Sequence, residues 1–188
     1  MPEKLDFITP TLMMILDLFL SDPMQEYHER EVVRRARVSK GSANRILRLL
    51  AGLDLLTRKR KGRMVFYKLN SEEAVARQFK VLVNVFELKR LVDQIKNDCR
   101  RIVLFGSCAE GVDAKDSDID LLVLTSTKNS VRKRVSEFNR NRSRKITPII
   151  VDPDGYMRLK REDRPLYENV ARGIVLWRKN ELRAQTLA

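Results

Sequence analysis

The hydrophobic and polar positions in the first third of the chain predict three helices followed by a hairpin. Apolar residues over 11–20 end at a Ser-Asp-Pro sequence that stops a helix, and a second helix is expected over 30–36. Ser39 can cap a third helix, because apolar residues recur after it at helical spacing. Two short strand-like runs then flank Lys61-Gly62, which is a hairpin turn signal. The apolar face of the third helix comprises Ala43, Ile46, Leu47 and Leu50.

A long helix is expected after the hairpin. Ser71 can cap this helix, with Glu72 and Glu73 in its first turn, and the helix extends to about Asn97. Its apolar positions occupy more than one face, so we expect it to pack on both neighbouring regions or on a second copy of itself. These positions are Val75, Phe79, Leu82, Val83, Phe86, Leu91, Val92 and Ile95.

From residue 101 onward the pattern changes to strands that alternate with helices. Apolar runs predict strands over 101–105, 119–124 and 146–151. The second of these runs is almost continuously apolar, as expected for a strand that is buried on both faces. A basic amphipathic helix lies between the second and third strands, and a helix near 164–172 and a strand-like run over 173–177 follow.

The charge of the chain makes a polyanion the expected partner. The 188 residues include 38 Lys and Arg against 25 Asp and Glu, a net charge of +13, which favours nucleic acid first and an acidic membrane surface second. The segment 27–69 alone carries 13 basic and three acidic residues, a net charge of +10. The excess therefore lies on the third predicted helix and the hairpin, whereas an ordinary solvated face would mix the signs.

Scarce cysteine and histidine exclude several classes of chemistry. Two cysteines indicate a reducing cytoplasm rather than a disulfide scaffold. His28 is the single histidine, which excludes zinc-type ligation and histidine-based activation of a nucleophile. The apolar run over 11–20 is too short to span a bilayer and is interrupted by Asp17, so we expect a cytoplasmic protein with no membrane partner.

Two short motifs carry the candidate chemistry. Gly106-Ser107 directly follows the first C-terminal strand, and Asp118-x-Asp120 opens the second. Gly106 lets a phosphate approach the backbone, the N–H groups at the helix start add favourable dipole charge, and Ser107 supplies a hydroxyl donor. Two like charges two residues apart on one strand face repel one another unless a cation lies between them. We therefore expect Asp118 and Asp120 to hold Mg²⁺ that bridges to a nucleoside triphosphate.

These motifs resemble the signature of the DNA polymerase β-like nucleotidyltransferases, in particular the minimal nucleotidyltransferases of archaea and bacteria. The resemblance covers about residues 100–178, and the spacing between the two motifs matches that group. It implies the transfer of a nucleoside monophosphate from a nucleoside triphosphate to a hydroxyl, with Ser107, Asp118 and Asp120 in the catalytic site. The residues that carry it are Gly106, Ser107, Ala109, Gly111, Ser117, Asp118, Ile119, Asp120 and the Leu-Leu-Val that follows.

Two departures from that family stand in this sequence. Cys108 and Glu110 occupy positions where relatives commonly carry basic residues. A third carboxylate is expected on the third strand, but Thr147 lies near that position. Asp152 follows about five residues later and on the other face of the strand, so it is a poor substitute.

Residues 1–70 resemble the winged helix-turn-helix family, which implies binding to double-stranded DNA. Basic side chains on the third helix and the hairpin can neutralise phosphates, and Asn44 and Arg45 can reach base edges. Such proteins often act as two-fold dimers on palindromic sites, which suggests a homodimer through the long helix. A winged helix used for protein contacts remains the alternative. The expected DNA contacts are Lys40, Ser42, Asn44, Arg45, Arg48, Arg58, Lys61 and Arg63.

The chain is thus predicted to be an α+β protein in three parts. They are a winged helix-turn-helix over 1–70, a linking helix over 71–98 and a small mixed-sheet nucleotidyltransferase-like domain over 99–188.

We expect a DNA-binding enzyme that modifies a protein or RNA hydroxyl, and we favour it because both metal-facing aspartates remain. The alternatives are a transcriptional regulator whose degenerate domain only binds metal–nucleotide or a partner, and an RNA-binding adaptor. The basic segment Val131–Lys145 is either a solvated face or a rim that guides an anionic acceptor.

Overall fold

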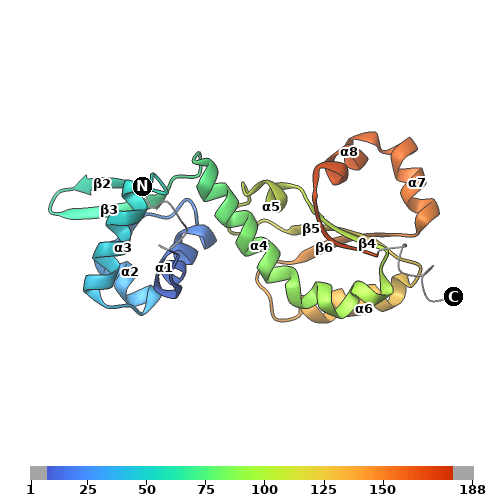
Figure 1. Ribbon diagram of the computed structural model, residues 1–188, viewed down its shortest axis with the longest axis horizontal. Coiled ribbons are helices and arrows are strands. Elements are labelled where there is room, and N and C mark those ends of the chain that lie inside the picture. Colours follow the sequence, from blue (N-terminus) through green and yellow to red (C-terminus); the bar gives the residue numbers. More distant parts are fainter. Residues whose placement is uncertain (1–7, 180–188) are drawn as a thin grey trace, which may run out of the picture. The chain divides into compact units, whose positions relative to one another are not determined.

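The computed structural model describes residues 8–179, which divide into two compact units with the boundary between residues 80 and 81. Each unit is described by itself below, with its elements labelled as in Figure 1. None of the helices within the described residues is both long and apolar enough to cross a bilayer.

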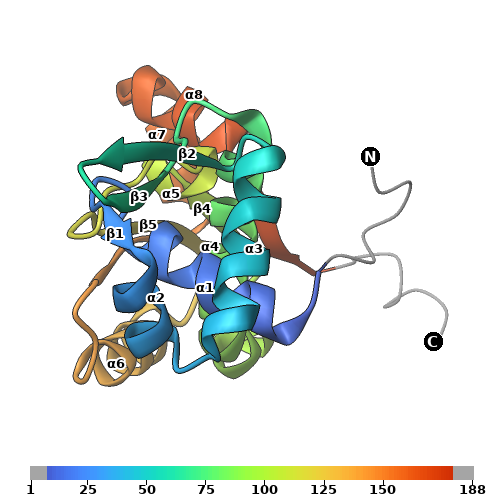
Figure 2. The same cartoon turned by 90° about the vertical axis from the view of Figure 1, so that its left-hand side faces the viewer.

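The first unit contains three helices and a small antiparallel sheet, in the order expected from the sequence. Helices α1, α2 and α3 pack together beside the hairpin (Figure 2). The cap expected at Ser39 is confirmed, because its hydroxyl oxygen accepts a 3.1 Å hydrogen bond from the backbone N–H of Ser42. The turn at Gly62 is also as expected, with φ at +61°. The elements are α1 (Pro10–Ser21), β1 (Tyr27–His28), α2 (Glu29–Ala36), α3 (Lys40–Gly52), β2 (Leu56–Lys61) and β3 (Met64–Leu69).

The sheet of this unit has the strand order β1-β3-β2. Strand β1, which the sequence analysis did not predict, is only two residues long and pairs Tyr27 with Tyr67 of β3. Such a strand has too few positions to show an alternation. Strand β2 lies at the edge, and every residue after Leu56 is exposed. Both faces of this basic strand are therefore open to solvent.

The second unit is a four-stranded mixed sheet covered by helices on both faces. The strand order is β6-β5-β4-β7, with β5 and β6 parallel and the other pairs antiparallel. The elements are α4 (Ala74–Ile95), a 3₁₀ turn η2 (Lys96–Asp98), β4 (Arg101–Phe105), α5 (Ser107–Glu110), β5 (Ile119–Leu124), α6 (Lys128–Asn139), β6 (Ile146–Val151), α7 (Pro153–Glu162), α8 (Arg164–Arg172) and β7 (Ile174–Arg178).

Alternation along the central strands explains why both faces of the sheet are covered. In β4, Ile102 and Leu104 pack in the core beneath α4 and α6, whereas Val103 and Phe105 pack beneath α7 and α8. Figure 1 shows these two helix pairs on opposite sides of the sheet. The near-continuous apolar runs of β4 and β5 are therefore explained by burial on two sides.

The start of α4 differs from the expectation. Residues 71–73 form a turn, in which the Glu73 N–H donates to Asn70 O (3.1 Å), so the helix begins at Ala74 rather than at Ser71. The Glu73 carboxylate instead accepts from the Val75 N–H at 3.4 Å, and no acidic residue lies in the first turn. The Asn70 side-chain amide donates a 2.9 Å hydrogen bond to Asp54 O. This bond holds the turn in place, so the helix starts at a later residue.

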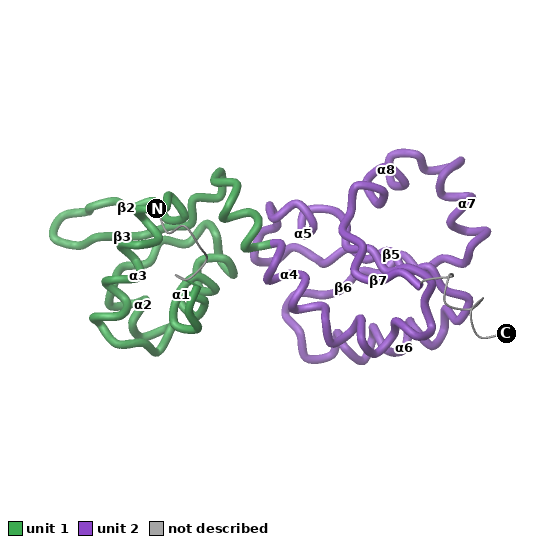
Figure 3. The backbone as a smooth tube through the Cα atoms, in the orientation of Figure 1, with its two compact units in different colours: residues 1–80 green, residues 81–188 purple. Residues whose placement is uncertain are grey.

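Helix α4 is shared between the two units, which are coloured separately in Figure 3. The boundary after residue 80 falls inside the helix, whereas the sequence suggested a linking helix that stands between two domains. Of its expected apolar face, Leu91 and Ile95 are fully buried, but Leu82 and Phe86 are exposed.

Gly173 holds β7 close to β4 and gives a test of this packing. A Cβ at Gly173 would lie 2.5 Å from Leu104 O and 2.7 Å from a Val103 methyl carbon. Backbone atoms cannot move aside cheaply, so we expect Gly173→Ala to lower the free energy of unfolding of the second unit by about 2 kcal/mol. Urea unfolding followed by the fluorescence of Trp177, the single tryptophan, measures this change.

The matched control for this test is Gly52→Ala in the first unit, where a Cβ meets no atom within 4 Å. It should leave the midpoint reported by Trp177 unchanged. An unshifted midpoint in Gly173→Ala would contradict the close approach of β7 to β4.

Candidate active site

Gly106 lies where β4 turns into α5, and its backbone brings the two sequence motifs together. Its φ of +68° favours glycine, and a Cβ at this position would lie 2.7 Å from the Asp120 Oδ2 atom. The register of β4 and β5 pairs Phe105 with Asp120, which places the carboxylate against the turn. Ser107 is the first residue of α5. The structure therefore brings the Gly-Ser turn and the Asp-x-Asp motif together, and the binding of phosphate and Mg²⁺ by these residues stays a prediction.

Asp118 and Asp120 form a pair of carboxylates at the start of β5. Asp118 precedes the strand and is exposed, whereas Asp120 is its second residue and is half-buried. Burial raises the pKa of the Asp120 carboxyl, and the nearby negative charge of Asp118 raises it further. A divalent cation would relieve this repulsion, and carboxylate oxygens are ligands that Mg²⁺ prefers. The donor set therefore fits Mg²⁺.

Thr147 occupies the position opposite this pair on the neighbouring strand. The parallel register of β5 and β6 pairs Asp120 with Thr147, and the Thr147 hydroxyl donates a 3.4 Å hydrogen bond to Asp118 Oδ2. Within the described residues 8–179, no group of three or more His, Cys, Asp or Glu side chains could hold a metal ion. A hydroxyl thus stands where the family resemblance implied a third carboxylate.

Asp152 does not replace the missing carboxylate. It follows Val151, which pairs with Leu124 at the other end of β5 from Asp120. Its carboxylate caps α7 through the Gly155 N–H (2.7 Å) and forms a 2.7 Å ion pair with Lys128. These contacts lower its pKa, first through Lys128. Asp152 is therefore a structural residue.

A buried polar network beside the site was missed by the sequence analysis. Arg144, in the loop before β6, donates to Asp113 Oδ2 at 2.9 Å and to Asn84 Oδ1 at 3.1 Å. The Asn84 amide in turn donates to Asp113 Oδ1 and to Cys108 O, both at 3.0 Å. Asp113 is only 4% exposed, and Asn84 2%. Buried charges are tolerable when they are paired and hydrogen-bonded in this way.

This network holds the backbone on both sides of the Asp118 α-carbon. Arg144 Nε donates to Ser117 O at 3.2 Å, and the Cys108 thiol donates to Asp118 O at 3.4 Å. Arg144 also donates to the Cys108 sulfur at 3.0 Å. Cys108, which departs from the basic residue of relatives, is thus part of the support for the loop that carries Asp118.

The basic segment Val131–Lys145 is less free than a guiding rim requires. Arg134 forms an ion pair with Asp98 (3.5 Å), and Arg142 pairs with Glu87. With Arg144 in the buried network and the Lys145 ammonium donating to Asn139 O at 2.8 Å, four of the seven basic residues of the segment are used within the unit. The exposed ones include Arg132, Lys133 and Arg140.

The expected DNA contacts of α3 lie in the first unit around a shallow groove of about 560 Å³. Lys40, Arg45 and Arg48 are exposed along it. Asn44 is different, because its amide nitrogen donates a 2.7 Å hydrogen bond to Glu29 Oε2, which occupies one of its two N–H donors. The Ser42 hydroxyl accepts from Ser39 at 2.9 Å.

The expected hairpin contacts are all exposed, but one is already paired. Arg58 and Arg63 face solvent. Lys61 forms an ion pair with Glu26, and its ammonium lies 5.1 Å from the centroid of the Phe66 ring. Contact with a phosphate would therefore compete with Glu26 at this residue.

With this geometry established, the second unit can be compared with known proteins. Residues 86–164 match the family model of the nucleotidyltransferase domain. None of the curated proteins matches the chain. The matched segment contains Gly106, Ser107, Asp118, Asp120 and Thr147, so the candidate site lies wholly within the part of the chain that is similar to this family.

Solved structures similar to this chain include proteins of three descriptions. A candidate nucleotidyltransferase from Sulfolobus solfataricus is 19% identical, with 56% of this chain and 89% of that chain covered and a TM-score of 0.38. A toxin–antitoxin structure with AMP-PNP is 23% identical, with 54% and 79% covered and a TM-score of 0.37. A DNA-binding protein from Sulfolobus solfataricus is 17% identical, with 46% and 96% covered and a TM-score of 0.33.

The raised pKa of Asp120 leads to a prediction about the carboxylate pair. Replacing Asp118 by Asn should lower the pKa of Asp120 part of the way, because the like charge is removed while burial remains. As the pH falls through the raised pKa, Asp120 gains a proton and the site loses charge. Affinity for a divalent cation should therefore decline at a higher pH than for an ordinary aspartate.

Carbon-13 NMR titration of the aspartate carboxyl groups measures this pKa. Asp116→Asn is the matched control, because Asp116 is an exposed acidic residue of the same loop and is not a cause of the shift. An Asp120 pKa that is the same in Asp118→Asn as in the unmodified protein would contradict the coupling of the two carboxylates.

Proposed function

We propose that the nucleotidyltransferase domain transfers a nucleoside monophosphate from a nucleoside triphosphate to a hydroxyl of a protein or nucleic acid. The observation that carries this proposal is the contact of the Gly106 turn with the Asp120 carboxylate, beside Asp118. This contact would bring a phosphate-binding turn and a metal-binding pair to one place. The match of residues 86–164 to the family supports the same reaction class.

Each residue of the site has a distinct role in this proposal. Gly106 keeps the backbone open to a close approach of the phosphates, and the Ser107 hydroxyl donates to a phosphate oxygen. Asp118 and Asp120 hold Mg²⁺, which when bound neutralises phosphate charge and polarises the phosphoryl group. Arg144 and Cys108 keep the Asp118 backbone in place, so the pair needs little rearrangement before it binds.

A regulatory role with little or no transfer is the second candidate, and Thr147 favours it. Within the described residues, a hydroxyl rather than a carboxylate faces Asp118 from β6. A general base typically contributes about 10²–10⁴-fold to the rate, so a site that lacks one is slow or only binds nucleotide. A carboxylate from the acceptor could supply the missing group.

Calorimetry with Mg²⁺ and each nucleoside triphosphate tests nucleotide binding. Asp118→Asn should abolish the binding heat, because both a charge and a ligand oxygen are lost. Asp116→Asn, in the same loop, should bind as the unmodified protein does. No heat with any of the nucleotides would refute both candidates.

Labelled nucleotide incubated with Mg²⁺ and cell extract then distinguishes the two candidates. Under the enzyme proposal, label is transferred to protein or RNA, and Asp118→Asn prevents it. Thr147→Asp should raise the transfer rate by about 10²-fold or more if the native site lacks its base. If both the unmodified protein and Thr147→Asp bind nucleotide but neither transfers label, the result supports the regulatory role.

We further propose that the first unit binds double-stranded DNA. The net charge of +10 over residues 27–69 supports a polyanionic partner. Lys40, Arg45 and Arg48 lie exposed on one helix, and β2 offers basic side chains from both faces. The hydrogen bond of Asn44 to Glu29 leaves Arg45 as the residue best suited to reading a base edge.

Arg48→Ala combined with Arg63→Ala tests the phosphate contacts. The double variant should weaken binding to all duplex sequences. It should also lower the slope of log Kd against the logarithm of the salt concentration by about two. Fluorescence anisotropy across a sodium chloride series measures both effects. Arg161→Ala combined with Arg164→Ala, which removes two exposed arginines of α7 and α8, is the control of equal charge. An unchanged affinity and slope in the double variant would exclude this surface.

A further inference from the structure

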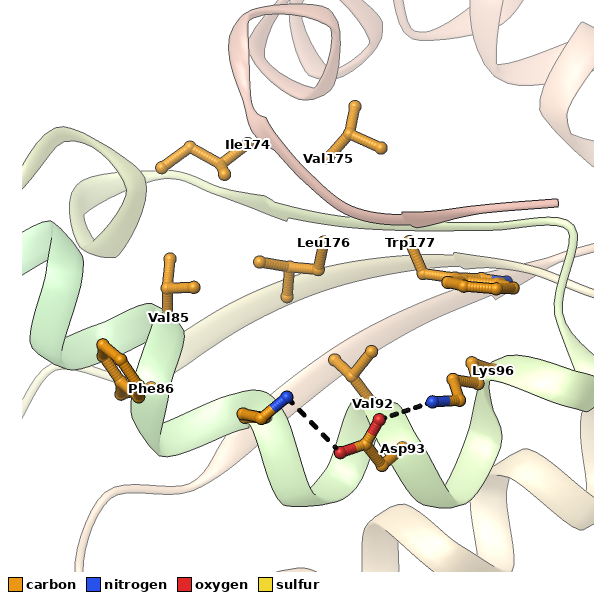
Figure 4. Close-up of a pocket in the computed structure, with 10 residues that line it drawn as sticks. Val85, Phe86, Val92, Asp93, Lys96, Ile174, Val175, Leu176 and Trp177 are labelled. Atoms are coloured by element: carbon orange, nitrogen blue, oxygen red, sulfur yellow. Dashed lines mark hydrogen bonds and ion pairs between the residues drawn. The ribbon is translucent and has the colours of Figure 1, made fainter. Parts of the chain in front are cut away.

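An apolar pocket of about 440 Å³ lies in the second unit between α4 and β7. Val85 and Val92 project from the helix toward Leu176 and Trp177 of the strand (Figure 4). The site described above uses none of these residues. Strand β7 is the outer strand of the sheet, so the pocket opens at a sheet edge.

A large aromatic side chain stands exposed at one end of this pocket. Phe86 is 65% exposed, and Leu82, one helical turn before it, is 43% exposed. At the opposite end, the Lys96 ammonium lies 5.8 Å from the centroid of the Trp177 ring. The same surface therefore carries both a projecting apolar group and an apolar hollow, which is the requirement for a self-complementary interface.

The exposed stripe of α4 has the spacing of a helix–helix contact. Leu82, Phe86, Lys89, Asp93 and the following Lys96 are separated alternately by four and three residues, and such a stripe stays on one side of a helix. Phe86 and Lys96 are ten residues apart, which corresponds to about 15 Å along the axis. We call this stripe, together with Trp177 and the pocket, the α4–β7 surface.

We propose that the α4–β7 surface is a two-fold interface with a second copy of this chain, with the two α4 helices antiparallel. A two-fold axis between Lys89 and Asp93 brings Phe86 of one copy to the pocket of the other copy, at the end where Trp177 and Lys96 lie. The axis makes the contact reciprocal, so two phenyl rings fill two pockets.

Charge complementarity favours a second copy over an acidic partner. Asp93 already accepts ion pairs from Lys96 at 2.6 Å and from Lys89 at 3.8 Å within its own chain. These three residues leave a net charge of only +1, so a strongly acidic peptide would gain little from the surface. In the antiparallel arrangement, each Asp93 faces Lys89 of the other copy, so both charges find a partner across the axis. The inference depends on neither nucleotide transfer nor DNA binding.

Sedimentation velocity of the full chain, from about 1 to 100 µM, tests the interface. The unmodified protein should form a dimer of twice 21.9 kDa. Phe86→Asp should weaken dimerisation by at least about thirtyfold, because it places a charge in an apolar pocket. Met157→Asp is the matched control, because Met157 is an equally exposed apolar residue (59%) on α7, and it should leave the dimer intact.

A charge exchange provides a second, independent measurement. Lys89→Asp alone and Asp93→Lys alone each bring like charges together across the axis and should weaken the dimer. The double variant Lys89→Asp/Asp93→Lys restores opposite charges and should recover it. Trp177 fluorescence during urea unfolding checks that each variant is folded. A monomer at every concentration, or a dimer that survives Phe86→Asp, would overturn the proposal.

Discussion

The close approach of the Asp120 carboxylate to Gly106 is the contact on which the surrounding structure depends. A larger residue at Gly106 would be strained by the φ of +68°, and its Cβ would lie 2.7 Å from the carboxylate oxygen, which would have to shift. The pairing of Phe105 with Asp120 fixes the same approach through the strand register. Once Asp120 is held against the turn, Asp118 lies beyond the strand end and in solvent, where a cation and a nucleotide have access.

The buried network of Arg144 supports this contact at a distance. A buried carboxylate such as Asp113 costs several kcal/mol to desolvate and is stable only when its oxygens are hydrogen-bonded. Arg144 and Asn84 supply these bonds. The network adds little net stability by this reasoning, but it selects one conformation for the loops before β5 and β6. The backbone of Asp118 is thereby held in one arrangement beside Asp120.

Features that depend on local pattern could be predicted from the sequence, and features that depend on distant pairing could not. The strands β4, β5 and β6 and the Gly106 turn were evident, because each has a continuous apolar run or a residue type with one steric use. Arg144 was hidden among seven basic residues, since charge counts do not reveal which arginine reaches a buried aspartate about 30 residues away. The hydrogen bond of Asn44 to Glu29 was missed for the same reason. The start of α4 was misplaced because Asn70 pairs with a distant carbonyl at Asp54.

The sharing of α4 between the units has a consequence for how this protein can be divided or recombined. Asn84 supplies the site network from this helix, and Leu88, Leu91 and Ile95 complete the core beneath the sheet. A fragment that started at residue 99, where the strands begin, would lose both contributions. A unit cut at the first strand would therefore be incomplete, and gene fusions that exchanged its partner would have to retain the second half of α4.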